Sequence, residues 1–428
     1  MRPLVVSIGT VSLATVGVAM SLALRPDRIS VPPSMSELAG RNTDIAFFET
    51  RAARDPRGAA DRAFLAGLYL QRARETGAYA DFVRAESTAR AALAIRPDRN
   101  TRALLALASS LLGQHRFAEA RAWAESLVAA TPEGIGARAL LGEIQLELGD
   151  YDAAGRTFGS LAGDAANLAV APRLASWAEI RGRPDEAHAL LVQARSDALR
   201  RVDLPREQIA WFQLRVADLA LRFGRFGEAD RALVAGLRAE PGDFRLLAAR
   251  TRLMALRGRW RAALRWGARA EAAGADIATL ALLGDVWAAR GDGGRARSYW
   301  AKAEQSARDK PEPYNRQWSL FRLDHGIGLD STRAILEREI GGRRDVYGWD
   351  QLAWARHLTG DRYGARAAMR EALRMGTQDA TVQYHAGLIA LADGDRAGAR
   401  AALERALAIN SRFHWFQVEG ARALLRAL

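Results

Sequence analysis

Residues 346–379, VYGWDQLAWARHLTGDRYGARAAMREALRMGTQD, contain two short helical patterns on either side of a Gly360-Asp361 turn. Gly360 ends the first pattern, because only glycine adopts the left-handed C-cap conformation at little cost. Each pattern has a narrow stripe of apolar or small residues at three-and-four spacing. These residues are Trp349, Leu352 and Ala353 in the first pattern, and Ala365, Met369, Ala372 and Leu373 in the second. The stretch predicts a helical hairpin that needs neighbours to form a core.

The same pattern recurs along the chain, with a glycine followed five residues later by an alanine. Spacings between successive glycines are 33, 42, 34, 33, 69 and 34 residues, so one unit carries an insertion and one is degenerate. Positions seven before and twelve after each glycine are small or aliphatic, as close approach of two helices requires. The turn glycines are Gly149, Gly182, Gly224, Gly258, Gly291, Gly360 and Gly394. Self-similarity at this period predicts an all-α solenoid of helical hairpins.

These residues resemble the tetratricopeptide repeat family, whose unit of about 34 residues has small side chains at these places and often a closing proline. Pro97, Pro132 and Pro241 match the closing position. The resemblance covers residues 61–413 and implies a right-handed superhelix of about ten units, with residues 61–411 as the solenoid. It departs from the family at Arg250 and Thr251, and at the turns of the two earliest units.

The N-terminal residues 1–24 are uncharged from Pro3 to Leu24, between Arg2 and Arg25. Such a run is about long enough to cross a bilayer as a helix. A cleaved signal peptide is the alternative, because Ser21 to Ala23 supplies the small residues of a cleavage site. We expect a single-pass inner-membrane anchor with the repeats on the extracytoplasmic side, or a periplasmic or secreted protein after cleavage.

The remaining segments flank or interrupt the repeats. Residues 25–42, with three prolines, predict a linker, and residues 43–60 a lone helix capped by Thr43 or Asp44. The insertion at 195–206 predicts either a longer helix or a surface loop. Residues 412–428 predict a capping helix that covers the apolar face of the last repeat.

Composition and motifs exclude several kinds of chemistry. The chain has no cysteine, and its six histidines fall in different units without metal-ligand spacing. No phosphate-binding glycine loop or hydrolase elbow occurs. We therefore predict no enzyme activity, no cofactor, no metal site and no small-molecule substrate. The net charge is +13, with only two lysines among 62 basic residues, a skew typical of a GC-rich bacterial genome.

In the repeat family, positions two, five, nine and twelve of each unit point into the concave groove. Carried over by register, these positions form a candidate partner-binding groove of aromatic, acidic and aliphatic residues with one arginine. They are Glu143, Trp211, Leu214, Asp218, Arg252, Asp285, Tyr347, Asp350, Trp354, His357, Tyr384 and Leu388. Such a surface suits an extended peptide or a helix of a partner protein.

The sequence thus favours a non-catalytic scaffold that binds proteins, attached to the membrane or exported, with a role in envelope assembly as one setting. The alternative is a helical-repeat protein that binds nucleic acid through its basic surface. Acidic residues in the candidate groove and the N-terminal apolar run weigh against that alternative.

Overall fold

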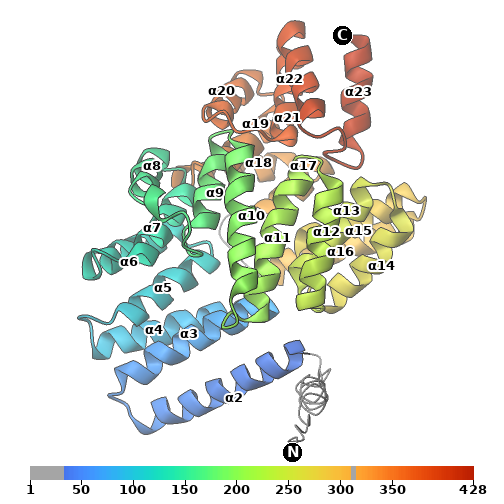
Figure 1. Cartoon of the computed structure of the whole chain (residues 1–428). Coiled ribbons are helices and arrows are strands. Elements are labelled where there is room, and N and C mark those ends of the chain that lie inside the picture. The colour runs from blue at the N-terminus through green and yellow to red at the C-terminus, as the bar shows by residue number, and fades with distance from the viewer. Residues whose placement is uncertain (1–32, 310–314) are drawn as a thin grey trace, which may run out of the picture.

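The computed structural model describes residues 33–309 and 315–428, and all regular structure in these residues is helical. Consecutive helices pack in pairs as ten hairpins, so the fold is the expected all-α solenoid (Figure 1). The hairpins are α3–α4 (Ala59–Thr76, Tyr79–Ile95), α5–α6 (Thr101–Gly113, Phe117–Ala130), α7–α8 (Ile135–Leu148, Tyr151–Gly159), α9–α10 (Ala171–Ile180, Pro184–Arg200), α11–α12 (Arg206–Arg222, Phe226–Ala239), α13–α14 (Phe244–Leu256, Trp260–Ala272), α15–α16 (Ile277–Ala289, Gly293–Asp309), α17–α18 (Arg316–Asp324, Leu329–Gly342), α19–α20 (Val346–Leu358, Arg362–Leu373) and α21–α22 (Ala380–Ala392, Arg396–Ile409). Single helices α2 (Pro33–Arg54) and α23 (Gln417–Ala427) flank them.

The repeated small residues lie where the two helices of a hairpin meet. Every alanine five residues after a turn glycine is fully buried, including Ala154 and Ala365. A Cβ added at Gly142 would come within 2.8 Å of the Phe158 ring, and one at Gly284 within 2.3 Å of the Trp300 ring. Because close packing leaves no room for a larger group, the small-residue register of the sequence is a packing requirement.

The two early hairpins, which were expected to lack the turn glycine, keep the same left-handed turn. His115 has φ 58° and stands where later units have glycine, and its left-handed backbone lets the Arg116 amide bond to the Leu111 carbonyl at 2.9 Å. Gly77, with φ 72°, ends α3 in the first hairpin. The first hairpin therefore has a turn glycine, contrary to expectation, and in the second hairpin His115 replaces the glycine but keeps the turn.

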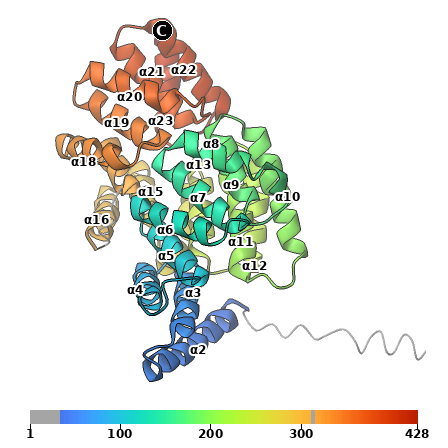
Figure 2. The same ribbon diagram turned by 90° about the vertical axis from the view of Figure 1, so that its left-hand side faces the viewer.

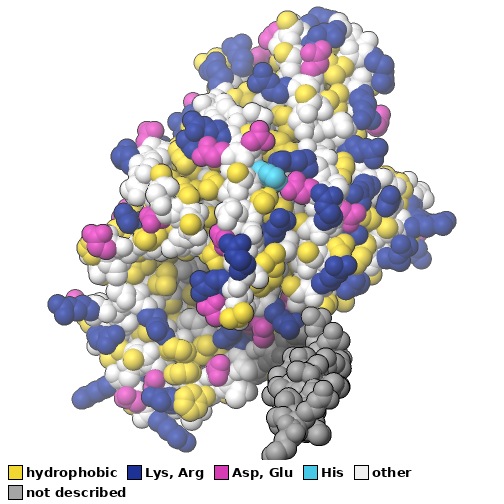
Figure 3. All heavy atoms as spheres, viewed as in Figure 1, with side chains coloured by type: hydrophobic (Ala, Val, Ile, Leu, Met, Phe, Trp, Pro, Cys, Tyr) yellow, Lys and Arg dark blue, Asp and Glu magenta, His cyan; other side chains and the backbone are white. Residues whose placement is uncertain are grey.

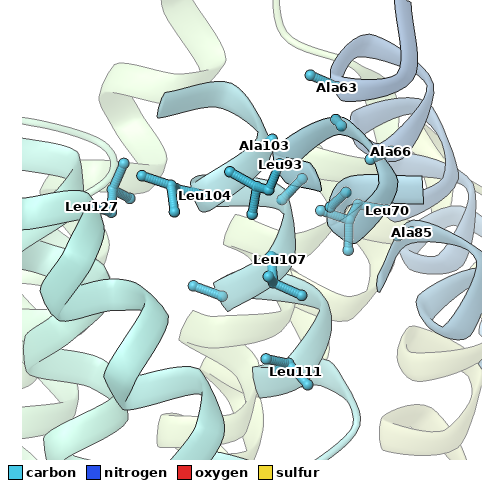
Figure 4. Close-up of a cluster of buried hydrophobic side chains, with 14 of the residues drawn as sticks. Ala63, Ala66, Leu70, Ala85, Leu93, Ala103, Leu104, Leu107, Leu111 and Leu127 are labelled. Carbon is cyan, nitrogen blue, oxygen red and sulfur yellow. The ribbon is translucent and has the colours of Figure 1, made fainter. Parts of the chain in front are cut away.

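The N-terminal core consists of leucine and alanine side chains from α3 to α7 (Figure 4). Ile45 of α2 joins this core with 3 % of its surface exposed, and Tyr69 of α3 donates a hydrogen bond to Glu49. Helix α2 thus packs on the first complete hairpin and covers its apolar side.

Both terminal helices differ from the sequence-based bounds. Helix α2 begins at Pro33, so residues 33–42 are helical and do not form the expected linker. Proline is well suited to the first position of a helix, where its missing N–H has no partner to lose. The expected anchor or signal at 1–24 and the rest of the linker lie outside the described residues. Among the helices that are described, none combines the length and the apolarity needed to cross a membrane.

Irregular units keep the hairpin form. The insertion continues α10 to Arg200 and leaves a short surface connection to α11, in which Val202 is fully exposed. It is therefore mainly a longer helix. The degenerate unit places Gly326 and Gly328, both with positive φ, in the turn between α17 and α18.

The solenoid closes on itself where the turns of the hairpins α7–α8, α9–α10 and α11–α12 contact the chain segments that follow α18, α20 and α22. We call this line of contacts the seam. The Arg344 amide donates to the Leu148 carbonyl at 2.9 Å, the Thr377 hydroxyl to the Ile180 carbonyl at 2.5 Å, and the Asn410 amide group to the Leu221 carbonyl at 3.0 Å. Partners in these last two bonds are 197 and 189 residues apart. Figures 1 and 2 accordingly show the C-terminal hairpins in orange and red lying against the green ones.

Side chains reinforce the seam. Arg343 pairs with Glu147, donates to the Glu147 carbonyl at 3.0 Å, and lies over the Phe117 ring at 4.4 Å from its centroid. The Tyr151 hydroxyl accepts the Val346 amide at 2.7 Å. Backbone groups that would otherwise be buried without partners are thus satisfied across the seam.

Turn glycines in the seam have a second role that the other turn glycines lack. A Cβ at Gly149 would lie 2.3 Å from the Arg344 carbonyl carbon, and one at Gly182 would lie 2.1 Å from the Gly376 oxygen. Gly258 and Gly360 have positive φ as well, but no atom lies within 4 Å of an added Cβ. The seam therefore needs glycine for close approach as well as for conformation.

We predict that Gly149→Ala destabilises the protein more than Gly258→Ala does. Both substitutions force a left-handed backbone, at about 1–2 kcal/mol. Gly149→Ala must also displace the Arg344 backbone, which adds about 1–3 kcal/mol of overpacking. Urea unfolding followed by circular dichroism measures both variants, and equal losses of unfolding free energy would contradict the seam.

Candidate functional site

A cavity of ≈ 510 Å³ lies against the first helices of four successive hairpins. Its apolar walls include Leu214 of α11, Phe244 of α13, Leu282 of α15 and Phe321 of α17. Residues 413–415, from the connection between α22 and α23, close one side. The volume is within the range of about 300–1,000 Å³ typical of ligand pockets. This cavity is the candidate functional site.

Two charged side chains in the cavity wall have no close partner. Asp218 of α11 and Arg252 of α13 both line the cavity, and neither makes a hydrogen bond or a close ion pair with another described residue. Burial raises the pKa of Asp218, although nearby arginines including Arg252 oppose the shift. Asp218 is half-buried, and a carboxylate partly removed from water usually has a partner, whereas Arg252 is exposed to solvent. Both charges are therefore available to a polar ligand.

Asp285 of α15 forms the best-connected polar group of the site. It has 7 % of its surface exposed, and its Oδ1 accepts the Trp300 indole N–H at 3.1 Å and contacts His325 Nε2 at 2.8 Å. Its Oδ2 accepts the Trp415 indole N–H at 3.1 Å. Burial lowers the pKa of His325, but the hydrogen bond to Asp285, the charge of that carboxylate and the hydrogen bond to the Phe321 carbonyl together outweigh burial, so the pKa is raised overall. The carboxylate thus joins α15, α16, α17 and the C-terminal segment.

Two further titratable groups border the C-terminal segment. Burial raises the pKa of Asp324 to about 6, and its Oδ1 accepts the Gln417 side-chain amide at 3.1 Å. Burial, together with Arg252, lowers the pKa of His414 to about 3, so His414 is neutral at physiological pH.

A second aromatic cluster forms between α19 and α21. The Trp354 ring stacks on His385 at 4.4 Å and on His357 at 5.2 Å. His385 is fully buried and its Nδ1 lies 2.9 Å from Asp350. Burial lowers the pKa of His385, but Asp350 outweighs this and raises it. Asp350, Trp354 and His357, three of the predicted groove residues, thus pack with His385 and do not form an open surface.

The structure brings four of the twelve predicted groove residues to the cavity, namely Leu214, Asp218, Arg252 and Asp285. Of the others, Glu143 pairs with Arg173 at 2.7 Å, and Tyr347 accepts from Arg222 at 3.1 Å. Asp350 contacts His385 Nδ1 at 2.9 Å. The remaining five lie in aromatic or apolar contacts elsewhere and are Trp211, Trp354, His357, Tyr384 and Leu388. The predicted groove positions thus do not all lie at one site.

Residues 413–417 are the part of the site that the sequence did not predict. A capping helix was expected from Arg412, but α23 begins only at Gln417, and residues 412–416 are irregular. Phe413 packs against the Tyr384 ring with 5.5 Å between centroids, while Trp415 reaches Asp285. A run of aromatic residues without helical spacing was the available signal.

Within the described residues, no three histidine, aspartate or glutamate side chains gather as metal ligands. The chemistry of the site is therefore described by hydrogen bonds, charge and apolar surface. The class of protein that the fold and the site define is a helical-hairpin solenoid with a partly closed internal groove.

Comparisons with known proteins add similarities of fold. No family of known proteins matches the sequence, and no curated protein does. Among solved structures, the chain is similar to the APC/C hetero-tetramer Cut9–Hcn1 (TM-score 0.34, 14 % identity, 97 % of this chain and 99 % of that one). It is also similar to a tetratricopeptide repeat protein from Parabacteroides merdae ATCC 43184 (TM-score 0.42, 16 % identity, 64 % and 98 %). A third is human IFIT1 dimer with PPP-AAAA (TM-score 0.47, 14 % identity, 73 % and 73 %). The fold assignment rests on the hairpins and small-residue contacts described above.

We predict that Asp324→Asn stabilises the protein at neutral pH and has little effect in acid. The folded-state pKa of about 6 lies above the ordinary value of 3.8, so the folded state favours the proton and loses stability as the pH rises through this window. Asparagine keeps an oxygen for Gln417 but never ionises. Thermal and urea unfolding should show a gain of about 1–2 kcal/mol at pH 7.5, after allowance for partial exposure.

The control for this pH effect is Glu404→Gln, which neutralises an exposed carboxylate on α22. It should change stability little at either pH. A gain for Asp324→Asn that is equally large at pH 4 and pH 7.5 would contradict the assignment of the effect to ionisation.

Proposed function

We propose that this protein is a non-catalytic scaffold that binds a segment of a partner protein in the groove around the Asp218 and Arg252 cavity. The observation that carries this proposal is the combination of apolar walls with two opposite charges that have no close partner. Aromatic and aliphatic walls supply buried area, and fixed charges supply orientation. A peptide segment provides both kinds of group on one chain.

The arrangement of helices supports a peptide over a rigid folded surface as the occupant. The cavity is bounded by α11, α13, α15 and α17 on one side and by residues 413–417 on another. A hollow of this size admits side chains and a short length of backbone, as grooves that bind extended peptides or helices do. We therefore assign the partner segment to this inner surface rather than to the outer helices.

The proposed location is the bacterial envelope, either anchored in the inner membrane through residues 1–24 or released after their cleavage. Support for this part comes from the uncharged N-terminal run alone. The intact mass of the protein purified from its native host distinguishes an uncleaved anchor from a cleaved signal.

A nucleic-acid partner is less well supported than a protein partner. Figure 3 shows Lys and Arg side chains spread over the visible face and interleaved with Asp and Glu. Many arginines are also paired, as Arg116 is with Glu86 at 2.6 Å and Arg72 with Asp81 at 2.7 Å. A phosphate-binding surface instead gathers basic residues along one stripe or face.

The test is site-specific photo-crosslinking in the native host with the full-length chain. A photoreactive amino acid replaces Ala248, which lines the cavity one helical turn before Arg252, and a matched control replaces Arg265 on the exposed side of α14. We expect a discrete protein adduct from position 248 and none of the same mass from position 265. An identical adduct from both positions would contradict a groove site.

A second measurement repeats the crosslinking after the charges at positions 218 and 252 have been exchanged. Asp218→Arg with Arg252→Glu preserves net charge and reverses the two unpaired groups, so it should reduce the adduct from position 248 at least tenfold while helicity is unchanged. The matched control is Asp185→Arg with Arg265→Glu, two exposed outer residues. Retention of the adduct in the groove variant, or recovery of nuclease-sensitive RNA in place of protein, would overturn the proposal.

A further inference from the structure

The chain's own C-terminal segment lies in the groove as a bound peptide would. Residues 412–416 form an irregular stretch between α22 and α23. Phe413 is 4 % exposed and packs on Tyr384, whereas Phe416 remains 43 % exposed. Between them, Trp415 extends toward α15 and packs beside the apolar cluster of α11 and α13. Three consecutive side chains, Phe413, His414 and Trp415, thus line the cavity, and the exposed Arg412 and Phe416 flank them.

Asp285 recognises this segment through the indole of Trp415. Its Oδ1 is already used by Trp300 and His325, at 3.1 Å and 2.8 Å. The other oxygen, Oδ2, has the Trp415 N–H as its only hydrogen-bond donor among the described residues, at 3.1 Å. Because a buried carboxylate oxygen needs a donor, a vacated site would require a similar donor from elsewhere. An indole suits the site because it combines one N–H with a flat apolar ring.

A competing segment can replace the contact of Trp415 with Asp285 while the residues on either side of 412–416 stay packed. In the described part of the chain, the indole is the only group of residues 412–416 that hydrogen-bonds to a groove helix. Asn410 is held separately by the seam, and α23 packs on α22 through Val418 and Ala421. The Trp415 side chain is half-buried and borders the cavity. Withdrawal of the Trp415 side chain from Asp285 therefore leaves both flanking segments, and Phe413 against Tyr384, in place.

We infer that Asp285 and the adjoining cavity form a receptor for an indole-bearing segment, and that Trp415 occupies this receptor in cis. The partner segment of the proposed function carries a tryptophan between apolar residues and takes the place of Trp415 on Asp285. This inference rests on the proposed function, because it specifies the chemistry of the segment that the groove binds. The charged groups of the partner segment contact Asp218 and Arg252, which line the same cavity.

The experiment measures binding of a fluorescein-labelled peptide, NSRFHWFQV, which has the sequence of residues 410–418. Fluorescence polarisation compares the full-length chain with its Trp415→Ala variant, in which the receptor is vacant. We expect the variant to bind the peptide at least tenfold more tightly than the unsubstituted chain. A peptide with phenylalanine in place of tryptophan should lose at least tenfold, because it keeps the ring and lacks the N–H.

Substitutions in the receptor make the test specific. In the Trp415→Ala background, Asp285→Asn should weaken binding about tenfold, since a neutral oxygen is a poorer acceptor than a carboxylate. The matched control is Asp276→Asn, which removes another cavity charge but keeps an N-cap oxygen for the Thr279 amide. This control should leave the affinity within about twofold. Trp415→Phe, which retains packing, guards against a folding defect in Trp415→Ala and should also admit the peptide.

Several results would overturn the inference. The inference is contradicted if neither position-415 variant binds the peptide, or if the unsubstituted chain binds it as tightly as the variants do. It is also contradicted if replacing the tryptophan of the peptide leaves the affinity unchanged. Dimerisation of the unsubstituted chain that Trp415→Ala abolishes would make the occupant a second copy and would also contradict it. The peptide assay needs no partner protein, so its failure with a successful crosslink at position 248 refutes this inference alone. Peptide binding without a crosslinked protein refutes the proposed function alone.

Discussion

The hydrogen bond from the Arg344 amide to the Leu148 carbonyl, with its counterparts at Thr377 and Asn410, holds together parts of the chain nearly 200 residues apart. Units in an ordinary solenoid contact only their neighbours, so such an array bends along its length and its end units unfold locally. Here the turns of three successive hairpins are also fixed against later connections. The seam therefore sets the radius of the superhelix and adds contacts of long sequence separation, which slow folding and make unfolding more cooperative.

The groove follows from this closure. Because Asn410 is held at the Gly224 turn, the chain that leaves α22 must pass the inner surface before α23 begins. That path carries Phe413 onto Tyr384 and Trp415 onto Asp285. The concave surface is accordingly not one long open channel. It is divided into a packed part around Trp354 and a cavity beside Arg252, and in the wall of that cavity Asp218 and Arg252 have no close partner among the described residues.

The sequence predicted the local features because their causes are local. Small residues such as Gly142 and Gly284 face large rings of their own hairpin, and a fixed spacing in one unit suffices to reveal this. The helix at Pro33 was missed because proline was interpreted as a linker residue, although it also fits the first turn of a helix. Groove register predicted Asp285 for the inner face, and in the structure Asp285 lines the cavity. Its occupant could not be foreseen, because the position of Trp415 depends on rotations accumulated over many hairpins.

The seam could not be predicted for a similar reason. The sequence shows Gly149, Gly182 and Gly258 as equivalent turn residues, yet only the first two have another backbone against the α-carbon. Small changes in the angle between successive units decide whether two turns of a superhelix meet. The hairpins also differ in helix length, as the 17-residue α10 and the 9-residue α8 show, and the repeat period of the sequence does not reveal the summed effect of such differences.

The most direct measurement of the closed architecture is amide hydrogen exchange at Arg344 in the unmodified protein. This amide belongs to a connection between hairpins, and its acceptor is the Leu148 carbonyl across the seam. If the seam forms in solution, the Arg344 amide exchanges as slowly as amides in the middle of α19. Exchange at the rate of an unprotected loop would contradict the closed superhelix, and with it the enclosed groove.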